Sequence, residues 1–339
     1  MPAPEEALAR LPLFADLTPE ELAAAARAWR PRTLAPGERL WEQGAAVDEL
    51  AIVTEGLLVA TLGGVEVARV HPGELVGEIA AFFAGQARSL ALTAHPPCSL
   101  LVLPVTGLRT LRWQRSVLYV TLLDHALHAV AARLRSVDAA ISRRGAGGHE
   151  PPAPPASPRW WRSATAEGPT DPRPDTIRVL RSLPAMREAA DEPMLAVADA
   201  FAVEPLSRGQ LLCREGEPGA DAWVLASGAV DTSRHGSGDG SELLATIAPG
   251  ARFGLLSLVD GGPRTATGIV TTPGWALRIT APAYAALTGD ARLRWQECML
   301  AALGSQVRGA NEILAGLGGN PADVNPPEPL STPPKAPRP

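Results

Sequence analysis

Residues 77–89 read Gly-Glu-Ile-Ala-Ala-Phe-Phe-Ala-Gly-Gln-Ala-Arg-Ser, beginning with Gly77-Glu78 and ending with Arg88-Ser89. A glycine that opens a short helix leaves free backbone N–H groups, and these attract an anion. An arginine that returns to the same place offers a planar set of donors that matches phosphate oxygens. Glu78 would repel a phosphate, but its carboxylate can accept hydrogen bonds from sugar hydroxyls. The stretch therefore predicts a site for the phosphate and ribose of a nucleotide.

The stretch resembles the phosphate-binding cassette of cyclic nucleotide-binding domains, the module shared by bacterial catabolite-activator regulators and kinase regulatory subunits. The resemblance covers about residues 8–142, and its flanks resemble, in order, the N-terminal helices and the barrel turns of that family. These flanks are Leu13–Leu22, Pro36–Glu38, Glu42–Gly44, Ile52–Gly56 and His71–Glu74. Each piece alone is weak evidence, whereas the ordered set is specific to the family.

The resemblance implies a role for each residue of this first site. The backbone from Gly77 to Ile79 would hold the cyclic phosphate, and Glu78 would accept a hydrogen bond from the ribose 2′-hydroxyl. Arg88 and Ser89 would donate to the phosphate oxygens. The expected ligand is a cyclic nucleotide, with no further cofactor and no metal.

The same pattern of glycines occurs twice. Three glycines of the first copy return 172 residues later and two return 177 residues later, so a loop near residues 233–242 is longer in the second copy. The pairs are Gly37 and Gly209, Gly44 and Gly216, Gly56 and Gly228, Gly73 and Gly250, and Gly77 and Gly254. An internal repeat of this kind predicts two copies of one domain.

The second copy departs from the pattern at its cassette. Leu255 stands where the first copy has Glu78, although Gly254, Arg264 and Thr265 remain. Loss of a hydrogen bond between a sugar and a charged acceptor costs about 1.5–3 kcal/mol, which predicts a weak or vestigial second site. Serine after the cassette arginine is similar to cyclic-AMP readers, and Arg264-Thr265 is similar to some cyclic-GMP sites. The sequence leaves cAMP and cGMP both open.

Short apolar runs separated by glycine- and proline-rich turns extend from about residue 33 to 103, which is typical of an all-β barrel or sandwich. The family implies an eight-stranded jelly roll, also called a double-stranded β-helix. The predicted fold class is mainly β with flanking α: two jelly-roll domains, each followed by a long C-terminal helix. The predicted segments are a first domain at 1–143, a Pro/Gly-rich linker at 144–175, a degenerate second domain at 176–318 and a disordered Pro-rich tail at 319–339.

Apolar residues recur at spacings of three and four after each predicted barrel. The first set is Val120, Leu123, Leu127, Val130, Leu134, Val137 and Ile141, and the second is Leu300, Leu303, Val307, Ala310, Leu314 and Leu317. The pattern fits a helix packed on its own barrel and equally a seam between helices. A homodimer through helices 115–142 and 291–317 is therefore one of two interpretations. His125 and His128 on the first helix either stack on a purine or are solvated.

Composition limits the function classes. The net charge is −5, and no basic cluster stands out on a predicted helix, which disfavours bulk binding to nucleic acid. Each long helix runs into a proline-rich segment, so we expect no DNA-reading helix and no direct DNA binding. We expect no apolar run of the length of a membrane span. The N-terminus lacks the features of a secretory signal, and three isolated cysteines argue against disulfides. We expect a cytoplasmic protein.

Enzyme motifs are missing from the sequence. None of the six histidines forms the His-x-His pair that a metal-dependent double-barrel enzyme needs, and no Gly-x-Ser-x-Gly or phosphate-loop lysine occurs. We therefore expect a non-catalytic sensor that binds ligand in the first domain and relays it to a protein partner through movement of the C-terminal helix. The alternative is a ligand-free scaffold built from retired folds. Trp160-Trp161 in the linker is either an anchor or a bystander.

Overall fold

The computed structural model describes residues 3–83, 86–145, 167–235 and 241–317. Trp160, Trp161 and the proline-rich tail lie outside the described residues. The chain divides into two compact units. The described part of the first unit runs to Ile141 and also includes residues 303–317, and that of the second runs from Ser142 to Ala302. The predicted domain boundaries stay predictions.

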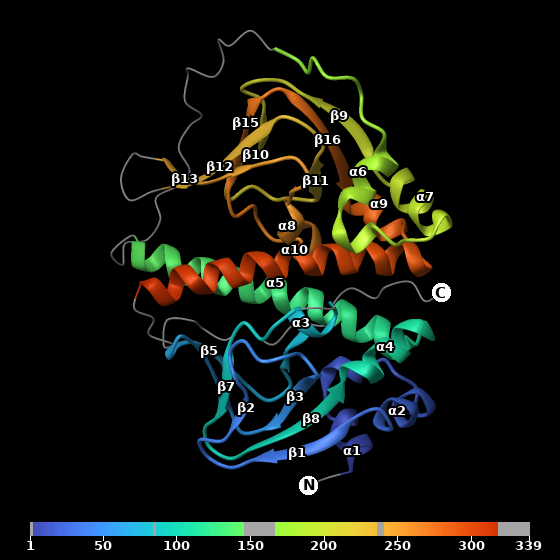
Figure 1. Cartoon of the computed structure of the whole chain (residues 1–339), viewed down its shortest axis with the longest axis vertical. Helices are drawn as coiled ribbons and strands as arrows, with labels where there is room; N and C mark the ends of the chain where they lie inside the picture. The colour runs from blue at the N-terminus through green and yellow to red at the C-terminus, as the bar shows by residue number, and fades with distance from the viewer. Residues whose placement is uncertain (1–2, 84–85, 146–166, 236–240, 318–339) are drawn as a thin grey trace. The chain divides into compact units, whose positions relative to one another are not determined.

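The first unit contains two four-stranded antiparallel sheets, with strand orders β1-β8-β3-β6 and β2-β7-β4-β5 (Figure 1). Its strands are β1 (Arg30–Leu34), β2 (Arg39–Trp41), β3 (Glu49–Glu55), β4 (Leu58–Leu62), β5 (Val65–Val70), β6 (Leu75–Val76), β7 (Ala91–Ala94) and β8 (Cys98–Pro104). Its helices are α1 (Pro4–Ala9), the 3-10 helix η1 (Pro12–Phe14), α2 (Pro19–Ala26), α3 (Glu78–Ala81), α4 (Val105–Trp113) and α5 (Val117–Gly145).

The second unit repeats this topology, with strand orders β14-β11-β16-β9 and β10-β15-β12-β13. Its strands are β9 (Ala202–Leu206), β10 (Leu211–Cys213), β11 (Asp221–Leu225), β12 (Ala229–His235), β13 (Ser241–Ile247), β14 (Arg252–Phe253), β15 (Thr267–Thr272) and β16 (Gly274–Thr280). Its helices are α6 (Thr176–Ser182), the 3-10 helix η3 (Pro184–Met186), α7 (Asp191–Asp199), α8 (Leu255–Asp260), α9 (Ala281–Ala286) and α10 (Gly289–Gly316). The predicted fold class, two eight-stranded domains each followed by a long helix, is confirmed.

Local sequence explains where key elements begin. Thr18 caps α2 by accepting from the backbone N–H of Glu21, and the Glu21 carboxylate accepts from the backbone N–H of Thr18. Gly56 and Gly228 turn the chain at positive φ, where a side chain would come within 2.3 Å and 2.5 Å of a backbone carbonyl oxygen. At these two positions the turn therefore requires glycine.

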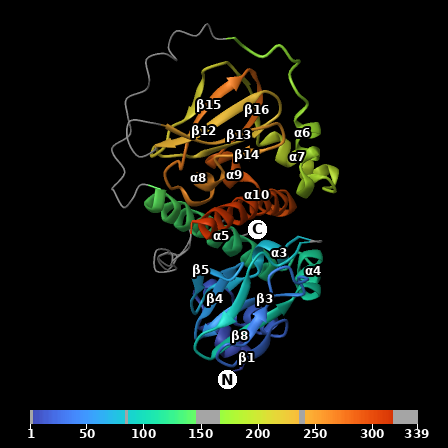
Figure 2. The ribbon, with the colours of Figure 1, turned by 60° about the vertical axis from the view of Figure 1, so that its left-hand side comes forward.

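The core of each domain lies between its two sheets. In the first domain it is built by buried aliphatic side chains of both sheets, among them Val53, Leu58 and Leu100, none of which is exposed. The corresponding core of the second domain includes Trp223, Leu225 and Phe253. The α3 helix lies between the strands and α5 in both ribbon views (Figures 1 and 2). Each barrel thus holds its cassette helix in a fixed place.

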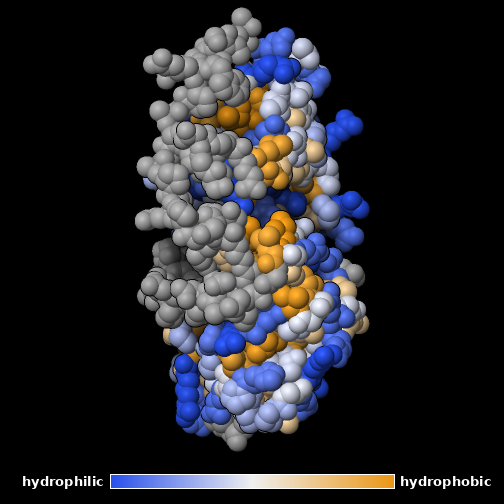
Figure 3. Space-filling model, turned by 90° about the vertical axis from the view of Figure 1, so that its left-hand side faces the viewer, coloured by the Kyte–Doolittle hydropathy of each residue, from blue (hydrophilic) through white to orange (hydrophobic). Residues whose placement is uncertain are grey.

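Both heptad patterns lie on long helices. Positions Leu123 to Ile141 on α5 and Leu300 to Leu314 on α10 are buried within a single chain, whereas Val120 and Leu317 are exposed. A homodimer through these seams stays a prediction. On the face drawn in Figure 3, hydrophobic residues occur as separate patches among hydrophilic ones.

One helix in the described part of the chain, Val117–Ser142, is long and apolar enough to cross a membrane by length and composition. The expectation that no apolar run has this length was therefore wrong. Half of its apolar window is buried inside the protein, and a helix packed into a core passes the same test.

Candidate functional site

The predicted residues of the first cassette surround one pocket of about 440 Å³, part of which is open to solvent. The lining residues are Trp41, Gly77, Glu78, Ile79, Ala80, Arg88, Ser89, Leu90, Arg133, Val307 and Asn311. All five residues expected from the sequence are brought together there, and Trp41, Arg133, Val307 and Asn311 are additions that sequence reasoning missed.

Gly77 starts the cassette helix and makes room for the arginine. Its φ is +81°, which L side chains rarely adopt, and it precedes the four-residue helix α3. A Cβ on Gly77 would lie 2.5 Å from Nη1 of Arg88 and 3.0 Å from the Trp41 ring. The position therefore requires glycine for both its conformation and its lack of a side chain.

Arg88 is almost fully buried, with 3% of its surface exposed. Its Nη2 donates to the backbone oxygen of Glu49 at 2.6 Å and to Oδ1 of Asp48 at 3.2 Å. The guanidinium carbon lies 3.6 Å from the centroid of the Trp41 ring. Its Nε and Nη1 are buried without a hydrogen-bond partner. Burial lowers the pKa of Arg88, while Asp48 opposes that shift.

Glu78 is 1% exposed and faces the same pocket. Its Oε1 accepts from Nη1 of Arg133 on α5 at 2.7 Å, and its Oε2 is buried without a hydrogen-bond partner. Arg133 supplies the charge that lets this carboxylate be buried, since an unpaired buried charge is very costly. The sequence holds only an indirect signal for Arg133, namely that a buried glutamate needs a cation from somewhere.

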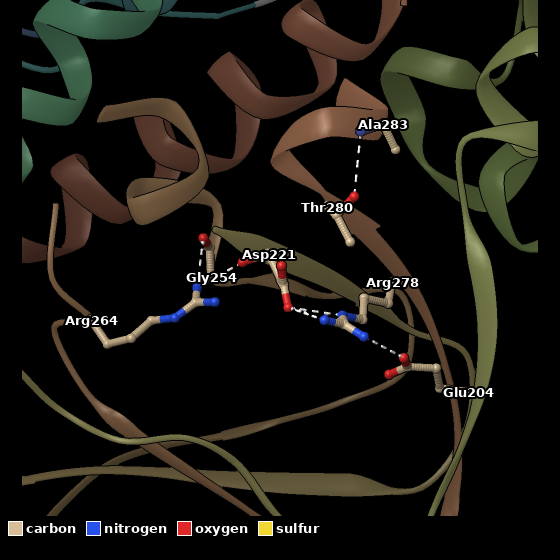
Figure 4. A network of polar contacts seen from close by, with 7 residues as sticks. All are labelled: Glu204, Asp221, Gly254, Arg264, Arg278, Thr280 and Ala283. Atoms are coloured by element: carbon tan, nitrogen blue, oxygen red, sulfur yellow. Dashed lines mark hydrogen bonds and ion pairs between the residues drawn. The ribbon is translucent and has the colours of Figure 1, made fainter. Parts of the chain in front are cut away.

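The second cassette has the same shape as the first, but its side chains make different contacts. Arg264 is 7% exposed, and its Nη1 donates to the backbone oxygens of Asp221 at 2.7 Å and Gly254 at 3.1 Å (Figure 4). Leu255 is buried, and Thr265 is exposed. Burial lowers the pKa of Arg264 as it does that of Arg88. Neither of the two pockets seen among the described residues is lined by Gly254, Arg264 or Thr265.

In each domain, the residue whose backbone oxygen accepts from the cassette arginine also forms a salt bridge through its own carboxylate. In the first domain Arg32 donates two hydrogen bonds to Glu49, at 2.5 Å and 2.9 Å. In the second, Arg278 pairs with Asp221, which occupies the place of Glu49, and donates to Glu204 at 2.9 Å (Figure 4). The hydrogen bond to Glu204, followed in size by the one to Asp221, raises the pKa of Arg278. Both domains therefore keep this salt bridge, but its arginine lies on β1 in the first domain and on β16 in the second.

The two histidines of α5 do not line the pocket, so the structure gives no support to stacking on a purine. Nδ1 of His128 lies 2.8 Å from the backbone oxygen of Asp124. Burial, together with the neighbouring His128, lowers the pKa of His125 to about 4. Among the described residues no group of three or more His, Cys, Asp and Glu side chains is placed to hold a metal ion.

Comparison with known proteins identifies both repeats. The family model described as "Cyclic nucleotide-binding domain" matches residues 31–114 and 203–289, together half of the chain. No DNA-binding family is found. The matched segments cover nearly all of both barrels; the first ends before α5 and the second ends at the first residue of α10.

Relatives match over single domains. A CRP-like cAMP-activated global transcriptional regulator of Mycobacterium tuberculosis is 31% identical over 37% of this chain and 57% of its own length. The acetyltransferase Pat of Mycolicibacterium smegmatis is 32% identical over 31% of each. The chain thus spans about half, or less, of the curated relatives it matches, and one of them is an enzyme.

A solved structure of similar fold is the regulatory domain of Toxoplasma gondii PKA with cAMP. It is 19% identical, covers 85% of this chain and 92% of its own, and superposes with a TM-score of 0.32. Because this TM-score is low, the family assignment rests on the family match and the paired sheets.

Proposed function

This chain belongs to the cyclic nucleotide-binding domain family, and from that premise we propose that it is a non-catalytic sensor of cAMP or cGMP with one live site, in the first domain. One observation carries the proposal. On a single pocket, Arg88 presents buried N–H groups and Glu78 a buried oxygen, and none of these has a hydrogen-bond partner. Each such group costs about 1–3 kcal/mol when unpaired, so a ligand that pairs both is favoured.

A cyclic nucleotide has the chemistry that these groups require. Its phosphate is an anion that a guanidinium recognises well, and its ribose hydroxyl is a donor that a carboxylate oxygen accepts. The Ser89 hydroxyl and the backbone amides after Gly77 would complete the phosphate contacts. The Trp41 ring lies 3.6 Å from the guanidinium carbon of Arg88 and so helps to hold the guanidinium in place.

The second domain is proposed to be inactive as a sensor. Nη1 of Arg264 already has two carbonyl partners, and Leu255 offers no acceptor for a ribose. A ligand there would have to replace hydrogen bonds that the fold already makes. This observation also favours the alternative, in which both domains act as a scaffold without ligand.

Ligand binding is proposed to reach the rest of the protein through Arg133. This residue lies on α5 and holds the carboxylate that would receive the ribose. A hydroxyl at Oε2 changes how strongly Oε1 holds Arg133, so occupancy biases the position of α5. The protein partner that would respond to the position of α5 is not specified by these contacts.

Calorimetric titration of cAMP and cGMP into the full chain tests the proposal. We expect binding with a stoichiometry near one, abolished by Arg88→Ala and kept by Arg264→Ala, its counterpart in the second domain. Circular dichroism checks that both variants fold. No heat from the wild type with either nucleotide at millimolar concentration would favour the scaffold, and loss of binding in Arg264→Ala alone would move the live site to the second domain.

A further inference from the structure

The second domain has a pocket that lies outside its cassette. The pocket measures about 1100 Å³, part of which is open to solvent. One wall is formed by α6 and the four residues before it, and the other by the end of β11 and the turn between β13 and β14. None of the described residues that line it belongs to the second cassette. The cavity is therefore separate from the place where a nucleotide would bind in this fold.

The chain before α6 is fastened to the barrel. The backbone N–H of Arg208 donates to the backbone oxygen of Glu167 at 3.0 Å. Four residues farther on, the backbone oxygen of Asp171 accepts from Nε1 of Trp275 at 2.9 Å. The segment then passes β9 and enters α6, where Asp175 caps the helix (Figure 1). One wall of the pocket is thus held in place by hydrogen bonds along its length.

Most of the residues that line this pocket are apolar. Leu225 is fully buried and belongs to the core of the second barrel, and Val179 and Ala226 are half-buried. Pro174 and Pro249 add two rings that have no backbone N–H to offer. A lining of this kind favours an apolar group, because burial removes apolar surface from water.

Two arginines bring positive charge to the pocket. Arg173 and Arg178 are both exposed, and neither side chain has a hydrogen-bond or ion-pair partner among the described residues. Asp175 is the one acidic residue among the described residues of the lining, and its Oδ1 already accepts from the backbone N–H of Arg178 at 2.8 Å. A guanidinium pairs well with the oxygens of an acid group. The lining thus favours a negatively charged ligand.

We propose that this pocket binds a small organic anion with an apolar body, such as an aromatic or aliphatic acid. The apolar body lies against Leu225, Ala226 and Val179, and the acid group pairs with Arg173 and Arg178. Ligand sites commonly combine a mostly apolar lining with a few polar groups that orient the ligand. The site is independent of the nucleotide sensor proposed above, and it gives the second domain a ligand of its own.

Two fluorescent probes that differ in charge test the proposal on the full chain. The anion 8-anilinonaphthalene-1-sulfonate and the neutral N-phenyl-1-naphthylamine share an apolar body, and only the first has an acid group. We expect the anion to bind more tightly. The double variant Arg173→Ala, Arg178→Ala should weaken the anion about tenfold and leave the neutral probe unchanged, since two exposed ion pairs are lost. Added salt should weaken the anion in the wild type.

A matched control removes the same charge elsewhere. The double variant Arg27→Ala, Arg30→Ala loses two exposed arginines of the first domain, and it should bind both probes as the wild type does. Circular dichroism checks that each variant folds. Unchanged binding of the anion in Arg173→Ala, Arg178→Ala would overturn the proposal, and so would an equal loss of the anion and the neutral probe.

Hydrogen exchange locates the bound anion. With saturating 8-anilinonaphthalene-1-sulfonate, we expect slower exchange in residues 173–182 of the wild type and no such change in Arg173→Ala, Arg178→Ala. Protection of the first cassette, residues 77–89, without protection of residues 173–182 would place the probe elsewhere and contradict the proposal. The cyclic nucleotide titration described above does not involve this pocket, so either proposal can fail while the other stands.

Discussion

Arg88 and Arg264 occupy the same place in two copies of one motif and have different surroundings. Both donate to a carbonyl on the strand that follows the second barrel turn, Glu49 in one and Asp221 in the other. Only Arg264 also has the carbonyl of its cassette glycine. Each guanidinium carbon lies over a tryptophan ring, 3.6 Å from the Trp41 centroid for Arg88 and 5.1 Å from the Trp223 centroid for Arg264. The same arginine therefore has different hydrogen-bond partners in the two domains, and only that of the first domain has buried N–H groups without a partner among the described residues.

Gly77 is expected to be more sensitive to substitution than turn glycines that have open space around them. Gly77→Ala puts a Cβ at positive φ and 2.5 Å from Arg88, whereas Gly64→Ala has a similar φ of +85° with nothing within 4 Å. Positive φ alone costs about 1–2 kcal/mol for alanine. Gly77→Ala should lower the melting temperature by more than Gly64→Ala and also weaken nucleotide binding. Equal melting temperatures for the two variants would show that the contact with Arg88 is easily relieved.

At the scale of elements, α5 combines three roles in one helix. Its apolar face, from Leu123 to Val137, is buried, its Arg133 holds the cassette glutamate, and its His125 is kept from ionising. The packing of such a helix depends on the charge of its buried polar groups and of the groups that they contact. The heptad pattern in the sequence indicates only the first role.

Acid is expected to destabilise the protein through His125. Its pKa is lowered from 6.5 to about 4 in the folded protein, so the unfolded chain binds a proton more readily. The stability from keeping it neutral is present above pH 6.5 and is lost as the pH falls toward 4. The loss at pH 5 is about 2 kcal/mol, from linkage.

Chemical denaturation at pH 7 and pH 5 measures this effect. His125→Gln cannot ionise, so its free energy of unfolding should change less between the two pH values than that of the wild type. His71→Gln, in the turn that follows β5, is the matched control. An equal pH dependence in the wild type and His125→Gln would show that other groups control the acid response.

On the scale of the whole molecule, two domains of one fold differ in their cassettes. One keeps an open pocket with unpaired polar groups, and the other fills its cassette with its own arginine and a leucine. Ligand should therefore order one domain and leave the other unchanged, because only a site that binds is stabilised by mass action.

Hydrogen exchange with saturating cyclic nucleotide tests this asymmetry and the relay. We expect slower exchange in residues 77–83 and in α5, and no change in residues 254–265. In Arg133→Met, saturating ligand should still protect the cassette and no longer protect α5, whereas Arg109→Met, exposed on α4, should behave as the wild type does. Equal protection of α5 in Arg133→Met would remove Arg133 from the relay.

The sequence by itself determined the fold and the repeat, and it predicted five residues of the first cassette that the fold brings to one pocket. These features are local: they consist of turn glycines at fixed spacing and of the pair Gly77 and Arg88. Local features of this kind can be recognised from the sequence alone. Only the tertiary structure decided which cassette is open. Arg133, Trp41 and Asn311 are far from the cassette along the chain, and a partner's distance in space cannot be read from its distance in sequence. Whether a buried arginine is satisfied depends on those distant groups, because hydrogen bonds form between atoms that the fold brings within about 3 Å.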